Sequence, residues 1–241
     1  TRAAFAEVTE KSFLSAKTRI GTRAVMTVIV IFLTFAGIVG VLWIGANGPG
    51  LIRLAGGKLT RYSKKDGLPS DIVYAVAIDA KGDVWAGTYG AGVARFDGRT
   101  FTVIDRSRGL PRDIVRCLLP GRDGAMWIGT DAGGLARLKD GVLSVLDTRH
   151  GLANDVVYHL LADEGLVWVA TAAGLSRFDP KSGSWTLHDT TNSIMHEPWC
   201  YAVALGPGRA WVGLWGGGVV ELERATGKWK EYRDPDGEME I

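Results

Sequence analysis

The apolar residues of this chain follow two different patterns. Residues 24–42 form an unbroken apolar run, AVMTVIVIFLTFAGIVGVL, which contains no charged side chain. From Trp43 onward, apolar and polar residues alternate in short segments that are separated by glycine-rich turns. An uncharged run of this length is typical of a membrane-spanning helix, whereas a period of two is typical of β-strands. The chain therefore divides into one hydrophobic segment and a β-rich body.

We predict that residues 24–42 form a transmembrane helix. At 1.5 Å per residue the run covers about 28 Å, which is close to the thickness of the hydrocarbon core of a bilayer. A pair of buried strands, a buried core helix and a cleaved signal peptide are the alternatives. The signal peptide fits less well, because no small-x-small cleavage site follows and because Trp43-Ile44-Gly45 already belongs to the first repeat described below.

The flanking charges predict the orientation of this helix. Four basic residues closely precede the run: Lys11, Lys17, Arg19 and Arg23. The first basic residue after the run is Arg53. Because basic residues favour the cytoplasmic side, residues 1–23 are expected to be a cytoplasmic tail in a single-pass protein of the bacterial inner membrane. The body of the chain is then expected in the periplasm.

A tryptophan recurs through the β-rich body at nearly constant spacing. Intervals of 42, 42, 41 and 43 residues separate Trp43, Trp85, Trp127, Trp168 and Trp211. Segments such as VWAGTYGAGVARF and MWIGTDAGGLARL surround these tryptophans. A period of this length indicates a repeat architecture.

A second landmark recurs between the tryptophans. Asp66-Gly67-Leu68-Pro69 returns as Arg108-Gly109-Leu110-Pro111 and as His150-Gly151-Leu152-Ala153. Acidic residues follow at intervals of 42 residues: Asp71, Asp113, Asp155 and Glu197. Because several features share one period, we assign the repeats to residues 43–233. Residues 234–241 are a C-terminal tail or the start of a next repeat.

Each repeat is expected to contain four short strands. In the second repeat these strands are predicted at about 71–79, 83–88, 92–97 and 100–105, and turns rich in glycine and aspartate join them. One such sheet cannot bury both of its faces, whereas sheets stacked around an axis bury most of them. We therefore predict an all-β fold, a β-propeller of about five four-stranded blades that one transmembrane helix precedes.

Two points about this propeller stay open at the level of the sequence. The first blade is expected to be incomplete, with three strands, because its innermost strand would fall within the apolar run. The sequence does not decide whether the ring closes. A parallel β-helix is the alternative fold, although its coils are usually shorter than 42 residues.

The pattern DGLPSDIV…AIDAKGDVWAGTYGAGVARFDG…FTVID resembles the two-component regulator propeller repeat. That repeat forms the extracytoplasmic sensor heads of many bacterial hybrid histidine kinases. The similarity extends over about residues 42–240, and the fifth repeat departs from it at residues 192–195 and at Glu221, where the other repeats have arginine. Typical heads of the family carry many more repeats and a kinase, which this sequence lacks. The resemblance thus implies the fold more directly than it implies a sensor.

Composition narrows the classes of function. The formal net charge is only +2, which argues against a nucleic-acid partner. Cys117 and Cys200 lie outside any metal-binding or redox motif, so we expect two small buried side chains, with a disulfide as the alternative.

No motif indicates catalysis, a cofactor or a metal. His150, His159, His188 and His196 do not have the spacing of metal ligands, and the sequence contains no nucleophile elbow, zinc-protease motif or P-loop. The segment 234–237 (DPDG) matches only the beginning of a calcium loop. We therefore predict a protein without enzymatic activity and without a cofactor.

Two polar positions recur with the repeat. One is the acidic position named above, and the other is filled by Arg53, Arg95, Arg137 and Arg177. Because catalytic residues normally break the symmetry of a repeat, we expect both positions to make the same structural bond in each blade. The alternative is an acidic ring at the mouth of the channel that binds a cation or a basic ligand.

Two functions fit these observations. The favoured one is a structural or interaction subunit of a larger bacterial membrane complex, respiratory or photosynthetic, whose propeller docks on neighbouring subunits. Trp199, Trp215 and Trp229 are its candidate contact residues. Its expected partners are an integral membrane complex and the lipid bilayer, and neither nucleic acid nor a small-molecule ligand is favoured. The alternative is an extracytoplasmic ligand-sensing head of a two-component-type regulator, which would bind a small molecule or a glycan.

Overall fold

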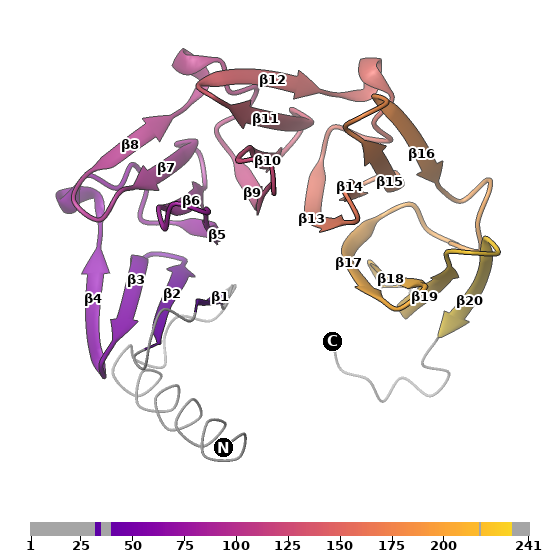
Figure 1. The fold of residues 1–241 in the computed structure, drawn as a ribbon, viewed down its shortest axis with the longest axis horizontal. Coiled ribbons are helices and arrows are strands. Elements are labelled where there is room, and N and C mark those ends of the chain that lie inside the picture. Colours follow the sequence, from indigo (N-terminus) through magenta and orange to yellow (C-terminus); the bar gives the residue numbers. More distant parts are fainter. Residues whose placement is uncertain (1–31, 35–39, 217, 233–241) are drawn as a thin grey trace.

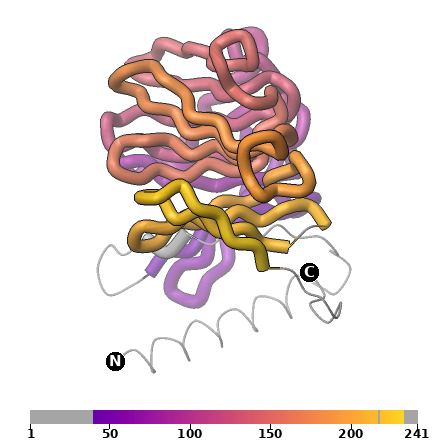
Figure 2. Tube along the Cα trace, turned by 90° about the vertical axis from the view of Figure 1, so that its right-hand side faces the viewer, coloured from indigo at the N-terminus to yellow at the C-terminus, as the bar shows by residue number. Residues whose placement is uncertain are grey.

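The computed structural model describes residues 32–34, 40–216 and 218–232, and in this part of the chain every regular element except three short 3-10 turns is a β-strand. Twenty strands form five four-stranded antiparallel sheets. Figure 1 shows the sheets as blades fanned around a centre, and Figure 2 shows them from the side. The all-β propeller predicted from the repeat is confirmed.

The strands of each blade follow one another from the innermost to the outermost. Blade one contains β1 (Phe32–Thr34), β2 (Val41–Ala46), β3 (Gly50–Ala55) and β4 (Lys58–Tyr62). Blade two contains β5 (Val73–Ile78), β6 (Val84–Thr88), β7 (Val93–Phe96) and β8 (Phe101–Ile104). Blade three contains β9 (Val115–Pro120), β10 (Met126–Thr130), β11 (Leu135–Lys139) and β12 (Val142–Leu146).

The last two blades follow the same order. Blade four contains β13 (Val157–Asp163), β14 (Leu166–Thr171), β15 (Gly174–Asp179) and β16 (Ser184–His188). Blade five contains β17 (Cys200–Gly206), β18 (Arg209–Leu214), β19 (Gly218–Glu223) and β20 (Lys228–Tyr232). Three 3-10 turns join the first four blades: η1 (Lys64–Asp66), η2 (Arg106–Arg108) and η3 (Thr148–His150).

The described blades form an open arc. Neighbouring blades contact each other through β2 and β5, β5 and β9, β9 and β13, and β13 and β17. In Figure 1, blade one and blade five stand at the two ends of the arc. The described residues therefore do not close the ring, a point that the sequence left open.

Blade one corrects one expectation. It has four strands instead of three, because β1 pairs with β2 in the register Phe32↔Trp43 and Thr34↔Val41. The backbone groups along the inner edge of β2 need hydrogen-bond partners, and the apolar run supplies a short strand for them.

The same finding bears on the predicted transmembrane helix. Residues 32–34, 41 and 42 of the span 24–42 are strands, so the helix prediction is wrong at these positions. The rest of that span lies outside the described residues, as do the predicted cytoplasmic tail and the segment 234–241. Within the described part of the chain, no helix has the length and hydrophobicity needed to cross a bilayer. At these positions pairing with β2 decides in favour of a strand, although the length of the run is typical of a helix.

The recurring tryptophan packs at the junction between blades. Trp43, Trp85, Trp127 and Trp168 are at most 7% exposed. Each lies in a cluster with residues of the following blade; Trp85, for example, shares a cluster with Leu110 and Val115. Burial of side chains this large is the main stabilising contribution of each junction.

A glycine two residues after the tryptophan makes room for the next blade. At three junctions a Cβ added to this glycine would lie 2.6–2.7 Å from a valine Cγ1: Gly45 with Val73, Gly87 with Val115, and Gly129 with Val157. In blade four the corresponding residues are Ala170 and Cys200, which share one buried cluster. A larger residue on one side of the junction thus meets a smaller one on the other.

The recurring aspartates hold the crossings between blades. Their Oδ1 atoms accept backbone N–H groups seven residues earlier, at 2.8–2.9 Å: Asp71 from Lys64, Asp113 from Arg106, and Asp155 from Thr148. The backbone carbonyl of Asp113 also accepts from Gly92 N of the preceding blade, at 2.8 Å. Glu197 makes no such bond to a turn, and its Oε1 is buried without a hydrogen-bond partner.

The recurring arginines lie over the junction tryptophans. In four blades the arginine is the cross-strand neighbour of the tryptophan, with its Cζ 5.4–6.0 Å from the ring centre: Arg53 on Trp43, Arg95 on Trp85, Arg137 on Trp127, and Arg177 on Trp168. In blade five Glu221 takes this position, and Trp211 Nε1 donates to its Oε2 at 3.0 Å. A cation–π contact is thus replaced by a charge-assisted hydrogen bond.

Candidate ligand-binding face

The innermost strands share an irregularity at their beginning. The pairing register skips one residue in each of blades two to five, and these residues are Tyr74, Arg116, Tyr158 and Tyr201. A β-bulge of this kind turns a side chain out of the regular alternation of the strand. In each blade the innermost strand and the second strand are antiparallel, so the start of the innermost strand lies beside the end of the second strand. The turn that follows the second strand therefore lies at the same end of the blade as the bulge.

Three of these bulge residues and two tryptophans form a continuous series of contacts across blades three to five. The Arg116 guanidinium lies 5.1 Å from the ring centre of Tyr158. Tyr158 stacks on Tyr201 with 4.3 Å between ring centres, and Tyr201 stacks on Trp215 at 4.8 Å. Trp199 lies 6.3 Å from Trp215. We call Arg116, Tyr158, Tyr201, Trp215 and Trp199 the aromatic row.

The aromatic row is open to solvent at its blade-five end. Trp215 is 54% exposed, Trp199 43% and Tyr201 38%. These values contrast with the nearly complete burial of the first four junction tryptophans. Exposed aromatic surface that is continuous over several side chains is typical of a binding site.

Polar groups gather at the other end of the row. Arg116 forms an ion pair with Asp131 at 3.1 Å. Asp131 also lines an open depression together with Arg106, Arg112, Asp113, Ile114 and Ala132. Burial raises the pKa of Tyr158, so its hydroxyl stays protonated at neutral pH and is able to donate a hydrogen bond. The row thus combines flat apolar rings with a few hydrogen-bonding groups.

The sequence-derived candidates fall into different places. Trp199 and Trp215 lie in the aromatic row. Trp229 does not; it is half-buried on β20, with its ring centre 5.4 Å from that of His188. The tyrosines of the row were not singled out from the sequence, although the spacing of Tyr74, Arg116, Tyr158 and Tyr201 by 42, 42 and 43 residues could have indicated them.

The remaining titratable groups do not converge. Among the described residues, no three His, Cys, Asp or Glu side chains are placed to share a metal ion. The recurring acidic residues do not form a ring of free carboxylates, because Asp71, Asp113 and Asp155 cap the turns between blades. Cys117 and Cys200 are buried and unpaired, and burial raises the pKa of Cys200 to about 12. Thiols in this state are poor nucleophiles at neutral pH.

The histidines make separate contacts. His159 Nδ1 accepts Val203 N at 3.3 Å, a hydrogen bond from blade four to blade five. His150 lies 2.8 Å from Asp147 Oδ1, and His196 lies 2.8 Å from Glu231 Oε1. Burial lowers the pKa of His159 and of His188 below the ordinary value of 6.5, because the charged imidazolium would lose its hydration.

We expect mild acidification to destabilise the propeller through these two histidines. As pH falls through 6.5, the unfolded chain takes up protons that the folded chain does not, so stability decreases until the lower folded-state pKa values are reached. The melting temperature should fall by roughly 2–4 °C between about pH 7.5 and pH 5.5. In His159→Gln, which keeps an acceptor for Val203 N and cannot be protonated, the decrease should be smaller. An equal decrease in both proteins contradicts this assignment.

The repeats of this chain match a known protein family. The family model described as two component regulator propeller matches residues 67–90 and 109–132. The chain carries two-component regulator propeller repeats. A search of curated proteins gave no match.

Solved structures with the same fold include regulators and an enzyme. The extracellular domain of a putative hybrid two component system, BT3049 from B. thetaiotaomicron, has a TM-score of 0.67 and 19% identity over 73% of this chain and 26% of that one. The corresponding domain of BT4673 has a TM-score of 0.69 and 18% identity over 80% and 28%. Virginiamycin B lyase from Staphylococcus aureus has a TM-score of 0.66 and 17% identity over 85% and 70%.

The propeller repeats of this chain are similar to extracellular domains of two-component regulators. This chain spans between a quarter and a third of the length of those regulator chains. Because the fold also occurs in a lyase, fold alone does not separate sensors from enzymes.

Proposed function

We propose that this chain is the extracytoplasmic recognition domain of a two-component-type regulator and that it binds its ligand on the aromatic row. The proposal rests on one observation: Tyr158, Tyr201 and Trp215 form a continuous stack at the bulged end of the innermost strands. The regulator propeller repeats support the class of protein. The similarity to extracellular domains of two-component systems supports an extracytoplasmic position.

The chemistry of the row fits a carbohydrate. The flat faces of sugar rings are lined by C–H groups, which pack against the electron-rich faces of indole and phenol rings. Sugar hydroxyls need a few fixed donors and acceptors, and the Tyr158 hydroxyl and the Arg116–Asp131 pair supply them at one end of the row. The low net charge of the chain argues against a polyanionic ligand.

We propose recognition without catalysis. The lyase of similar fold is inactive when one of its histidines is replaced, whereas the four histidines of this chain make unrelated contacts at separate places in the fold. No described histidine belongs to the aromatic row. Arg116 and Asp131, at one end of the row, are paired with each other.

The test is direct binding of defined oligosaccharides. Maltohexaose, cellohexaose and xylohexaose are titrated into the purified protein, and binding is followed by tryptophan fluorescence and calorimetry. We expect at least one to bind at one site per chain and to shift the emission of Trp215 and Trp199. Trp215→Ala should weaken binding at least ten-fold, because a stacking ring at the exposed end is lost.

The matched control is Tyr232→Ala. Tyr232 is 39% exposed on the outermost strand β20 and is not part of the aromatic row, so its replacement should leave binding unchanged. If no oligosaccharide binds, or if Tyr232→Ala reduces binding as much as Trp215→Ala, the aromatic row is not the binding site.

A further inference from the structure

Blade two carries a pair of tyrosines that the aromatic row does not include. The rings of Tyr74 and Tyr89 meet edge to face, with 5.6 Å between their centres and 62° between their planes. Tyr89 is 49% exposed and Tyr74 is half-buried. Neither ring is part of a buried cluster in the described part of the chain. We call Tyr74 and Tyr89 the tyrosine pair, and core packing does not account for it.

The tyrosine pair holds the same two positions as Tyr201 and Trp215 of blade five. Tyr74 and Tyr201 are both bulge residues of an innermost strand. Tyr89 and Trp215 both directly follow the second strand of their blade. Each of these two donates its backbone N–H to the carbonyl of the residue two positions before the bulge: Tyr89 to Ile72 at 3.0 Å, and Trp215 to Trp199 at 3.1 Å. One repeated backbone bond thus places both aromatic pairs on the same side of the propeller.

Blade three continues this side of the propeller with an ion pair. Asp131 directly follows the second strand, and its N–H donates to Ile114 O at 3.0 Å, which is the same repeated backbone bond. Its partner Arg116 is the bulge residue of the blade. Blade three therefore presents a charged pair at the two positions where blades two and five present aromatic rings.

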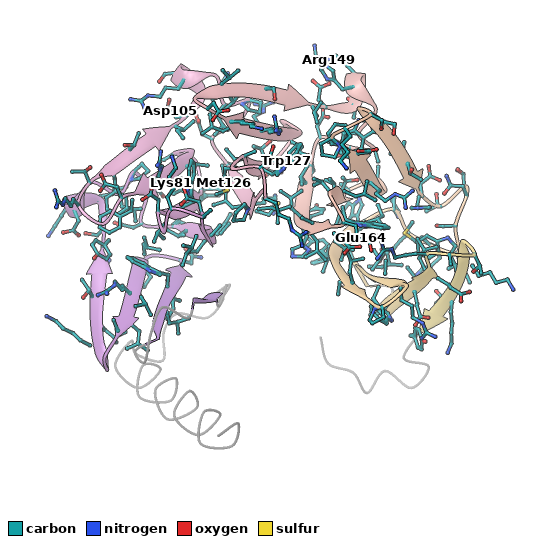
Figure 3. All side chains as sticks on the ribbon, in the orientation of Figure 1. Lys81, Asp105, Met126, Trp127, Arg149 and Glu164 are labelled. Atoms are coloured by element: carbon teal, nitrogen blue, oxygen red, sulfur yellow. The ribbon has the colours of Figure 1, made fainter. Side chains whose placement is uncertain are left out.

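Contacts between the innermost strands set the order of these groups. β5 contacts β9, β9 contacts β13, and β13 contacts β17. Figure 1 shows these strands in this order around the centre of the arc, and Figure 3 adds the side chains in the same view. The ion pair of blade three and Tyr158 of blade four thus lie between the tyrosine pair and the stacked rings of blade five.

The spacing of the blades sets the length of ligand that reaches both aromatic pairs. Sheets that pack face to face lie about 10 Å apart. Three junctions separate blade two from blade five, which gives a span of up to about 30 Å along the arc. A single sugar ring contacts one pair only, whereas a chain of several rings is able to contact both.

The surface between the two aromatic pairs carries no excess charge. Arg116 and Asp131 neutralise each other at 3.1 Å. The open depression beside them is lined by two arginines and two aspartates: Arg106, Arg112, Asp113 and Asp131. A surface with paired donors and acceptors suits a neutral ligand that is rich in hydroxyl groups.

We infer that the tyrosine pair is a second subsite for the ligand of the aromatic row, so that this side of the propeller selects long oligosaccharides over short ones. The inference rests on the proposed function, because it assigns the same class of ligand to a second set of rings. The exposed ring of Tyr89 packs against the C–H groups of a sugar, as Trp215 does in blade five. A chain that already contacts one subsite reaches the second at a high effective concentration, so its affinity rises with length.

The test compares short and long oligosaccharides by calorimetry. Maltotriose, cellotriose and xylotriose are set against maltohexaose, cellohexaose and xylohexaose. In the series that binds, we expect the wild type to bind the hexasaccharide at least ten-fold more tightly than the trisaccharide. Tyr89→Ala should weaken binding of the hexasaccharide at least five-fold and leave binding of the trisaccharide unchanged. Trp215→Ala should weaken binding of both.

Two further variants serve as controls. Tyr89→Phe keeps a ring that is able to stack, so it should retain most of the affinity for the hexasaccharide. Tyr232→Ala removes an exposed tyrosine from the outermost strand β20 and should bind both lengths like the wild type.

Hydrogen exchange of the wild-type protein gives a second readout that does not depend on a variant. The hexasaccharide should slow exchange in the turn at residues 89–91, whereas the trisaccharide should leave that turn unchanged. This comparison keeps the inference testable if Tyr89→Ala folds poorly.

The failure of this inference is distinct from the failure of the proposed function. Equal affinities for the two lengths, an undiminished affinity of Tyr89→Ala for the hexasaccharide, or an unprotected turn at 89–91 overturns the second subsite. In each of these cases the aromatic row still stands if Trp215→Ala weakens binding. If no oligosaccharide of either length binds, the proposed function fails and the second subsite fails with it.

Discussion

Gly87→Ala is expected to lower the free energy of unfolding by about 2 kcal/mol, since the new methyl group would overpack a junction that has no space for it. An added Cβ would lie 2.6 Å from Val115 Cγ1 and 3.2 Å from Ala75 Cβ, so blades two and three would have to move apart. For a chain of this size the melting temperature should fall by roughly 4–8 °C. Thermal and urea unfolding measure the change.

Blade four suggests how this defect can be repaired. Its junction combines Ala170 with Cys200 where blade two has Gly87 with Val115. The double variant Gly87→Ala/Val115→Cys should therefore lose less stability than the two single variants together, with a coupling energy of about 1 kcal/mol. Additive effects would show that the two residues do not share one contact.

Gly213 provides the matched control for Gly87. It holds the same position in blade five, but an added Cβ would lie 3.8 Å from Ala202 Cβ and touch no following blade. Gly213→Ala should therefore leave stability within about 0.5 kcal/mol of the wild type, or raise it, because alanine restricts the unfolded chain.

The fold was accessible from the sequence because the repeat is carried by chemically distinct residues. Tryptophans at nearly constant intervals, turn glycines and recurring acids share one period, and each has a separate physical role in the structure. Trp85 fills a junction, Gly87 admits the next blade, and Asp113 caps the crossing turn. Three residue types with separate physical roles and one shared period are not expected in another fold.

The first blade shows where the pattern was insufficient. Phe32, Leu33 and Thr34 lie in an uncharged run whose periodicity does not distinguish a helix from a buried strand. The deciding factor is tertiary, because β2 has an inner edge that needs hydrogen-bond partners. The partner also departs from the repeat: Trp43 pairs with a residue eleven positions earlier, whereas Trp85 pairs with Ala77.

The bulge residues of the aromatic row were missed for a different reason, although Trp199 and Trp215 were named. Tyr158 and Tyr201 recur at the repeat position of Tyr74 and therefore look like core residues in a strand that alternates regularly. The β-bulge at the start of each innermost strand removes them from that alternation. Sequence patterns of period two do not register such a bulge, although the recurrence itself was visible.

Trp168→Ala is expected to have the largest effect of any single substitution considered, a loss of about 3–5 kcal/mol. Its side chain is fully buried and shares a cluster with Ala170, Leu175 and Val203 of blades four and five. Truncation would leave a cavity in the buried cluster between blades four and five. Trp168→Phe should cost clearly less, because it keeps a ring and removes an indole N–H that has no hydrogen-bond partner.

Trp215 is the comparison that separates a core tryptophan from one on the binding face. It is 54% exposed and belongs to the aromatic row. Trp215→Ala should change stability by less than about 1 kcal/mol, since more than half of the residue stays exposed to water in the folded state.

Thermal unfolding of Trp168→Ala and Trp215→Ala is measured side by side with the wild type. It tests the central claim that the repeating tryptophans hold the blades together, whereas Trp215 of the aromatic row serves ligand binding. The account predicts that Trp168→Ala melts roughly 10 °C or more below the wild type and that Trp215→Ala melts within about 3 °C of it. Equal decreases in the two variants, or a larger decrease for Trp215→Ala, would contradict it.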